Sequence, residues 1–342
     1  MKGILAVIAT LVVAQATNSH QHNELCHGFI PENDMSIPVG HVFMNGEETG
    51  ITEQEFNDSI DRVEAIYAPI IEAKGKKLDM KRLWSNSTVN ASAQQFGDTW
   101  RVNMYGGLAR HPSMTVLGFT AVVCHELGHH LAGAPKYGRF NGWASGEGQS
   151  DYFATSKCMR KVYSFQEDLD YAVEKEIELE ELAVNTCRET FYTYEEEPET
   201  PSEGEPEAPS QEEMLAEEGE QAPEEEEKTE PTEKELSIAA FNRCLRNAES
   251  GRDLATLLND LSRGKTAPRF DTPSESVVRR TSNSHPKAQC RLDTYYAGSL
   301  CTVDPEVDFD NKDPLVGACN RVDGATTSAR PLCWYKPPVV EE

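Results

Sequence analysis

Apolar residues recur at spacings of three and four between residues 52 and 74, the pattern of a helix with one buried face. Thr52 and Glu55 form a capping-box pattern at its start, and Gly75 is a typical helix terminator. We therefore expect an amphipathic helix over this range. Its apolar positions are Phe56, Ile60, Val63, Tyr67 and Ile70.

Three extended segments follow this helix, over residues 77–84, 88–95 and 99–105, with turn residues between them. A second helix is expected to begin near Ser113 and to be apolar on nearly every side, so it should run through the middle of the core. These elements predict an α+β fold in which a small mixed sheet packs on the second helix.

Further helices are expected from Glu147 to about Tyr163, from Phe165 to about Tyr192, and from Leu236 onward. Beyond Lys265 the chain is rich in loop-forming residues. Residues 302–342 show no periodicity from which a fold can be predicted.

The formal net charge of -26 is concentrated in one segment. Residues 195–235 contain 19 Glu, two Lys, six Pro and no aromatic residue, so the rest of the chain carries only -9. Such a segment cannot bury enough apolar surface to offset the loss of chain entropy, and we expect a disordered linker. The alternative is an acidic arm that binds a cation or a basic protein. No basic face for phosphates is encoded, which disfavours nucleic-acid binding.

Residues 1–16 have the pattern of a secretory signal peptide. Lys2 precedes an apolar run from Ile4 to Ala14, and Ala14-Gln15-Ala16 is a small-x-small cleavage pattern. We expect cleavage near Ala16 and a secreted or periplasmic mature protein. The run is too short to span a bilayer comfortably and no other long apolar stretch occurs, so no membrane span is expected.

Export predicts that most of the nine cysteines form disulfides, and the odd number leaves at least one over. Cys124 is the candidate for the free thiol, because it lies in the helix that carries the histidine motif described next. Local spacing suggests the pairs Cys290–Cys301 and Cys319–Cys333, although the sequence alone leaves the connectivity open.

The segment His125-Glu126-Leu127-Gly128-His129 carries the clearest candidate chemistry. Two histidines four residues apart lie on one face of a helix and can bind one metal ion. Glu126 lies beside that ion without being a ligand and can act as a general base. Burying these groups in an apolar helix is costly without a partner, and Zn²⁺ supplies one. His130 points about 140° away from the metal face and is not expected to be a ligand.

A catalytic zinc site needs a third protein ligand and an open position. Glu147 is the candidate, since it begins the next predicted helix 18 residues after His129. The alternative is a carboxylate placed there only because the helix dipole favours it. Asp151 follows one turn later and can accept a hydrogen bond from a ligand imidazole, which would fix its tautomer.

Three runs of sequence resemble the HtpX-like peptidases, relatives of the type I CaaX endopeptidases in the gluzincin clan. They are Val89-Asn90-Ala91, residues 102–108 and residues 122–129, followed by the Glu147-x-x-x-Asp151 pattern. The resemblance covers about residues 52–163. It implies a zincin-like (gluzincin) fold, whose edge strand binds an extended polypeptide substrate by main-chain hydrogen bonds, and we expect residues 99–105 to be that strand.

Ser284-His285-Pro286 and Arg291 are similar to a downstream motif of the same proteins. The resemblance implies that His285 approaches the zinc as a further ligand or an oxyanion donor, and that Arg291 assists nearby. An ordinary loop histidine and a surface arginine are the alternative.

The chain is thus predicted to comprise a signal peptide (1–16), a zincin-like domain (17–194), the acidic linker (195–235) and a disulfide-braced region (236–342) that packs back on the zincin-like domain. The predicted function is a zinc-dependent endopeptidase acting on polypeptides. The alternatives are a non-catalytic zinc-binding module acting through its acidic arm, and a latent peptidase in which His285 or Cys124 occupies the open metal position.

Overall fold

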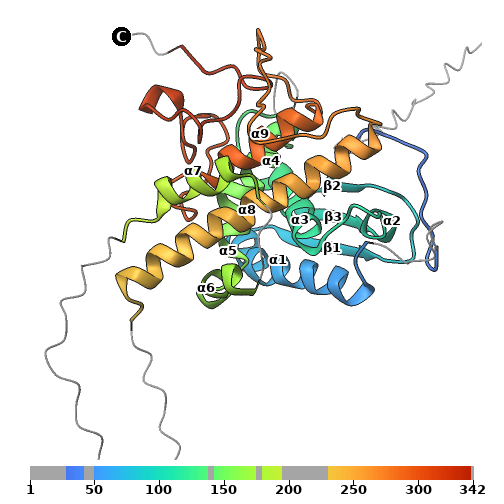
Figure 1. Cartoon of the computed structure of the whole chain (residues 1–342). Coiled ribbons are helices and arrows are strands. Elements are labelled where there is room, and N and C mark those ends of the chain that lie inside the picture. The colour runs from blue at the N-terminus through green and yellow to red at the C-terminus, as the bar shows by residue number, and fades with distance from the viewer. Residues whose placement is uncertain (1–27, 42–49, 138–141, 175–178, 195–229, 340–342) are drawn as a thin grey trace, which may run out of the picture.

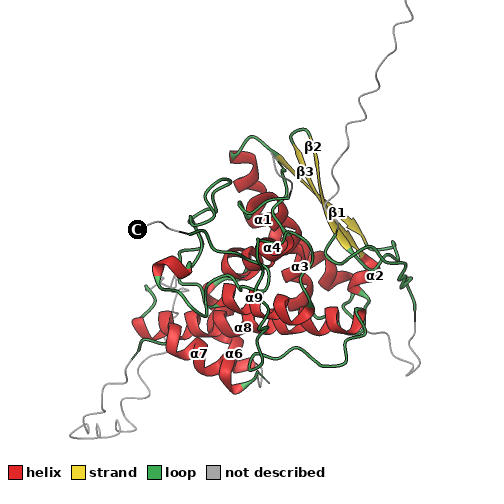
Figure 2. Ribbon diagram, turned by 90° about the horizontal axis from the view of Figure 1, so that it is seen from above, coloured by secondary structure: helices red, strands yellow, loops and turns green. Residues whose placement is uncertain are grey.

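The computed structural model describes residues 28–41, 50–137, 142–174, 179–194 and 230–339. Within these ranges the protein has an α+β fold, with a three-stranded sheet at one edge and helices α6, α7 and α8 on the opposite side (Figures 1 and 2). The predicted signal peptide lies outside the described residues. No helix within them is long and apolar enough to cross a membrane.

Helix α1 (Glu53–Ala73) forms as predicted. Thr52 accepts a hydrogen bond from the backbone N–H of Glu55, and the Glu55 side chain accepts one from the backbone N–H of Thr52, so the capping box is complete. The face carrying Phe56 and Ile60 is fully buried and packs against the core.

The sheet contains β1 (Lys77–Leu83), β2 (Ala91–Phe96) and β3 (Thr99–Tyr105) in the order β1-β3-β2. Strand β1 is parallel to β3, and β2 is antiparallel to it, so the sheet is mixed as expected. The prediction that residues 99–105 form the edge strand is wrong. Strand β3 is central, because it forms a hairpin with β2 on one side and pairs with β1 on the other; β1 and β2 are the two edge strands.

Helix α2 (Gly106–Ala109) follows β3 directly and leads into α3 (Val116–Leu131). Thr115 caps α3, its hydroxyl accepting the N–H of Gly118 at 2.9 Å. Every residue of α3 from position 117 to position 130 is buried, which confirms the predicted helix through the core. Helices α1, α4 and α8 and strands β2 and β3 pack around it.

A nearly continuous helical stretch follows, made of α4 (Glu147–Phe153), a π-helical turn (Ala154–Cys158) and α5 (Met159–Lys161), as predicted. The prediction of a single helix from Phe165 to about Tyr192 is wrong. The structure has α6 (Phe165–Glu174) and α7 (Glu181–Phe191), with non-helical backbone at Leu179 and at the N-cap Glu180. At this break between α6 and α7, the Glu180 carboxylate accepts a hydrogen bond from the backbone N–H of Asp271, in the C-terminal half of the chain.

Helix α8 (Glu233–Leu261) is the long helix that crosses the molecule in Figure 1, and it packs on α3, α6, α7 and α9 (Ala288–Ser299). It begins three residues before the predicted start, inside the segment expected to be disordered. Thr232 and Glu235 form a capping box at its start, and the amino-acid composition of the acidic segment does not reveal it. Residues 195–229 of that segment lie outside the described residues.

The described residues contain four disulfides, and they correct the predicted thiol and pairs. Cys124 is not free, because it faces Cys158 on the π-helical turn and is bonded to it. The ninth cysteine, Cys26, lies outside the described residues. The bonds are Cys124–Cys158, Cys187–Cys244, Cys290–Cys333 and Cys301–Cys319.

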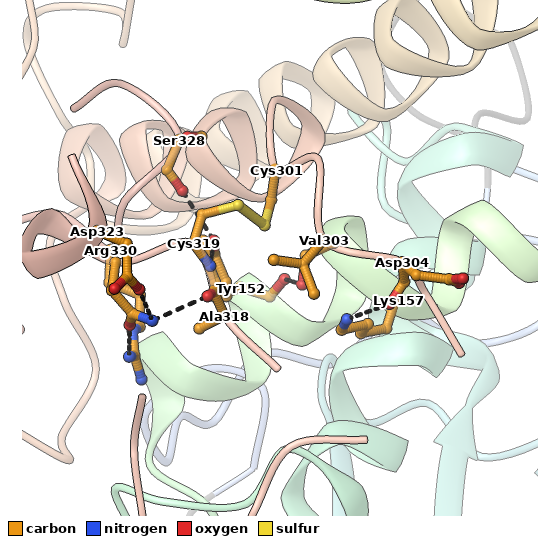
Figure 3. The surroundings of a disulfide bond; sticks show 12 residues. Tyr152, Lys157, Cys301, Val303, Asp304, Ala318, Cys319, Asp323, Ser328 and Arg330 are labelled. Atoms are coloured by element: carbon orange, nitrogen blue, oxygen red, sulfur yellow. Dashed lines mark hydrogen bonds between the residues drawn. A yellow bond between two sulfur atoms is a disulfide. The ribbon is translucent and has the colours of Figure 1, made fainter. Parts of the chain in front are cut away.

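The C-terminal pairs differ from the prediction because two distant segments run side by side. The N–H groups of Val278 and Ser282 donate to the carbonyls of Leu332 and Trp334, which brings residue 333 to α9. The Cys301–Cys319 bond stabilises a second loop, and nearby the hydroxyl of Tyr152 of α4 donates a hydrogen bond to the Ser328 carbonyl (Figure 3). The last described residues, including a 3₁₀ turn at Arg321–Asp323, are therefore anchored on α4 and α9.

Candidate metal centre

His125 and His129 lie one turn apart on α3, and both side chains are fully buried. Their ring centroids are 4.8 Å apart and the rings are nearly perpendicular. Nδ1 of His125 lies 2.7 Å from Asp151 Oδ1, and Nδ1 of His129 lies 2.8 Å from the Ser145 carbonyl oxygen. These contacts fix the rings so that both Nε2 atoms face the carboxylate of Glu147.

Glu147 is the first residue of α4 and is fully buried. Its Oε2 lies 3.2 Å from His125 Nε2, and its Oε1 lies 3.8 Å from His129 Nε2. Two ligands of a tetrahedral zinc ion are about 3.3–3.5 Å apart when each bond is about 2.0–2.2 Å long. The two separations lie on either side of this spacing, so the Glu147 carboxylate is near the position that a third ligand would take. Burial alone would raise the pKa of Glu147, but the two imidazoles outweigh it and lower that pKa.

Glu126 is fully buried beside the same histidines, and neither carboxylate oxygen has a hydrogen-bond partner among the described residues. Nε2 of His125 and Oε2 of Glu147 are 3.2 Å apart but also form no hydrogen bond with any described residue. Burial raises the pKa of Glu126 to about 8. His125, Glu126 and His129 offer ligand atoms that all lie within 4.8 Å of one another, so this group could hold a metal ion. Buried polar atoms without partners are costly, and a cation would satisfy them.

Asp151 connects the histidine motif to α9. It accepts hydrogen bonds from Arg291 Nε at 2.8 Å, from an Arg291 terminal nitrogen at 2.6 Å, and from the hydroxyl of Tyr295. Burial opposes ionisation of Asp151, but Arg291 and His125 hold its pKa below the ordinary value. The same carboxylate keeps His125 charged in the metal-free protein: burial lowers the pKa of that imidazole, yet Asp151 raises it to about 9.

We expect Asp151→Asn to weaken zinc binding by roughly 10–100-fold, because an amide is a poorer acceptor for the His125 Nδ1–H and holds the ring less firmly. The dissociation constant is measured by competition with a chromophoric chelator, with folding checked by circular dichroism. Asp170→Asn, on the exposed face of α6, is the matched control and should bind zinc as the wild type does. An unchanged affinity in Asp151→Asn would remove this residue from the account.

The downstream residues singled out by the resemblance lie beside the same centre. His285 Nε2 is 3.5 Å from Glu147 Oε2, and it donates a hydrogen bond to the Gly28 carbonyl at 2.8 Å. Arg291 is almost fully buried, so it is not a surface arginine. His130, in contrast, is stacked between the rings of Trp100 and Trp143, away from the cluster, as helical geometry predicts.

Three contacts at the centre were not predicted. The hydroxyl of Tyr137 donates to Glu147 Oε1 at 2.7 Å, and the backbone carbonyl of Ser145 holds His129. Both come from the loop between α3 and α4, whose sequence shows no periodicity. Tyr295, which holds Asp151, follows Arg291 by four residues on α9, and that helical spacing could have revealed it.

Comparison of the chain with models of known protein families, with curated proteins and with solved structures finds no match.

Proposed function

We propose that this protein is a zinc-dependent endopeptidase with a zincin-like fold, similar to the HtpX-like peptidases, and that it acts on polypeptides outside the cytoplasm. One observation carries the proposal. Two imidazoles of α3 and the carboxylate of α4 converge at spacings suited to one tetrahedral ion, and the unpartnered carboxyl of Glu126 lies directly beside them. The four disulfides support the location, since such bonds are typical of exported proteins.

In this proposal His125, His129 and Glu147 hold the metal. Bound zinc would act as a Lewis acid toward the scissile carbonyl and its attacking water. Glu126 accepts a proton from the water and delivers it to the leaving amine. His285 donates a hydrogen bond to the carbonyl oxygen as negative charge develops there. Asp151 and Arg291 are positioning residues, because they hold the His125 ring and do not reach the reacting atoms.

The substrate would bind along β2 rather than along β3. Strand β2 lies at the edge of the sheet and packs against α3, whereas β3 is paired on both sides. An exposed strand edge can add an extended peptide through main-chain hydrogen bonds, with little dependence on sequence. Unfolded polypeptides are the substrate class that offers such a strand.

The rival function is a non-catalytic zinc module that works through its acidic segment. A variant in which every Glu between residues 195 and 229 is changed to Gln distinguishes the two hypotheses. This change keeps the chain length and the helix cap at Thr232. We expect the variant to hydrolyse a reduced and alkylated test protein at the wild-type rate, because the metal centre is formed by α3, α4 and α9.

The same assay with a chelator, followed by added zinc, should abolish and then restore hydrolysis in both proteins. Fragments are followed by mass spectrometry. Hydrolysis that persists without metal would contradict the proposal. Binding of a basic protein that disappears in the Gln variant, in a protein with no hydrolytic activity, would favour the rival.

A further inference from the structure

The first described residues of the chain lie in the candidate active site. The backbone N–H of Phe29 donates to the Ala91 carbonyl at 3.0 Å, at the start of edge strand β2. The side-chain amide of Asn90 forms two hydrogen bonds with the backbone of Ile30, the residue after Phe29. Its Oδ1 accepts the Ile30 N–H at 3.2 Å, and its Nδ2 donates to the Ile30 carbonyl at 3.1 Å. Farther on, an antiparallel bridge joins Ser36 to Thr88. Residues 28–37 therefore run antiparallel to the chain that enters β2.

Phe29 is held by the residues that organise the metal centre. An Arg291 terminal nitrogen donates to the Phe29 carbonyl at 2.7 Å, and the guanidinium lies over the phenyl ring at 4.4 Å. The phenyl ring of Phe29 and the imidazole ring of His125 pack edge to face, with their centroids 5.2 Å apart. The Phe29 side chain is fully buried. The imidazole of His125 and the guanidinium of Arg291 thus hold Phe29 by its ring and by its carbonyl.

The carbonyl of Gly28 meets the candidate oxyanion donor. It accepts a hydrogen bond from His285 Nε2 at 2.8 Å, and that nitrogen is 3.5 Å from Glu147 Oε2. Gly28 has a φ of 81°, and a Cβ at this position would meet the Ala91 carbonyl oxygen and the Asn90 amide at 2.9 Å. The close approach of this peptide to β2 therefore requires glycine.

Three of the contacts that hydrolysis of the Gly28–Phe29 bond would need are present. Main-chain bonds to an edge strand align the peptide, ring and guanidinium contacts hold the side chain after the bond, and a donor reaches the carbonyl oxygen before it. We propose that the protein cleaves its own chain between Gly28 and Phe29, an inference that rests on the proposed peptidase function. It also assigns the substrate class: glycine before the scissile bond and a large apolar residue after it.

The step balances as an ordinary peptide hydrolysis. The oxygen of water adds to the Gly28 carbonyl carbon, and Glu126 accepts a proton from that water. The bond from this carbon to the Phe29 nitrogen breaks, and the nitrogen takes up the proton. The proton that remains on the new carboxyl group passes to the amine, so the products are a carboxylate on Gly28 and an ammonium on Phe29.

The test uses the full chain, as wild type and as Glu126→Gln, purified with a chelator and then given zinc. Intact mass and N-terminal sequencing follow the chain over time. The wild type should gain a species that begins at Phe29, with the same half-life over a 100-fold dilution, because the bond lies in the chain's own site. Glu126→Gln should keep the bond. In this uncleaved variant, hydrogen exchange at the Phe29 and Ile30 amides should be slow with or without zinc, which reports the bound segment independently of activity.

Three results would overturn the inference. The first is a wild-type chain that stays intact at this bond while the same sample hydrolyses a reduced and alkylated test protein, which would leave the peptidase proposal standing. The second is a half-life that shortens in proportion to protein concentration, which would make the reaction intermolecular. The third is rapid exchange at both amides. Absence of hydrolysis of either substrate with zinc bound would refute the peptidase function itself.

Discussion

Glu126→Gln is expected to lower hydrolysis of an unfolded polypeptide by about 10²–10⁴-fold while the protein still binds zinc. The glutamine side chain cannot take the proton from water, and it cannot return a proton to the leaving amine. The substitution should be mild for the fold. Burial raises the pKa of Glu126 to about 8, so in the metal-free protein at neutral pH the carboxyl is mostly uncharged, and a neutral amide of the same size replaces it.

Initial rates on a reduced and alkylated protein, with zinc content measured on the same samples, check this expectation. Glu72→Gln is the matched control, because Glu72 is exposed near the end of α1 and should leave both quantities unchanged. Wild-type hydrolysis in Glu126→Gln would remove the proposed base. Loss of zinc in that variant would mean that Glu126 is a ligand instead.

The helices and the histidine motif were accessible from the sequence because their signals are local. His125 and His129 share a face of α3 through the four-residue spacing alone, and Glu147 and Asp151 repeat that spacing on α4. The capping residues Thr52 and Glu55 marked the start of α1 in the same way. Contacts within one helical turn depend on few residues, so the pattern predicts them well.

The order of the strands was not accessible in this way. The short turn between residues 96 and 99 predicts that β2 and β3 pair, but nothing near β1 shows that it joins β3 in parallel rather than β2. Helix α1 packs on β1 and helix α3 packs on β2 and β3, and no residue pattern within the strands encodes this packing. The wrong edge strand and the wrong disulfide pairs have this common origin in long-range packing.

The contacts of the first described residues were the least predictable. Gly28 and His285 are 257 residues apart, and Phe29 and Arg291 are 262 apart. A Gly-Phe pair in an irregular segment carries no periodic signal. Its meaning depends on the metal centre that the rest of the chain builds around it.

Loss of a metal ligand should have the second large effect. His129→Ala and Glu147→Ala each remove one of the three proposed protein ligands, so each should weaken zinc binding by more than the ~100-fold that loss of a residue hydrogen-bonded to a ligand can cause. Glu147→Ala also leaves the imidazoles of His125 and His129 without the carboxylate that lies 3.2 and 3.8 Å away. Hydrolysis should fall with zinc occupancy in both variants.

His130→Ala is the matched control on the same helix, since His130 is stacked between two tryptophans and does not face Glu147. The decisive measurement is zinc content per chain after dialysis against a weak chelator, with circular dichroism as the check on folding. About one zinc per chain is expected in the wild type, in Glu126→Gln and in His130→Ala, and almost none in His129→Ala and Glu147→Ala. Folded His129→Ala and Glu147→Ala that each retain one zinc would contradict this expectation.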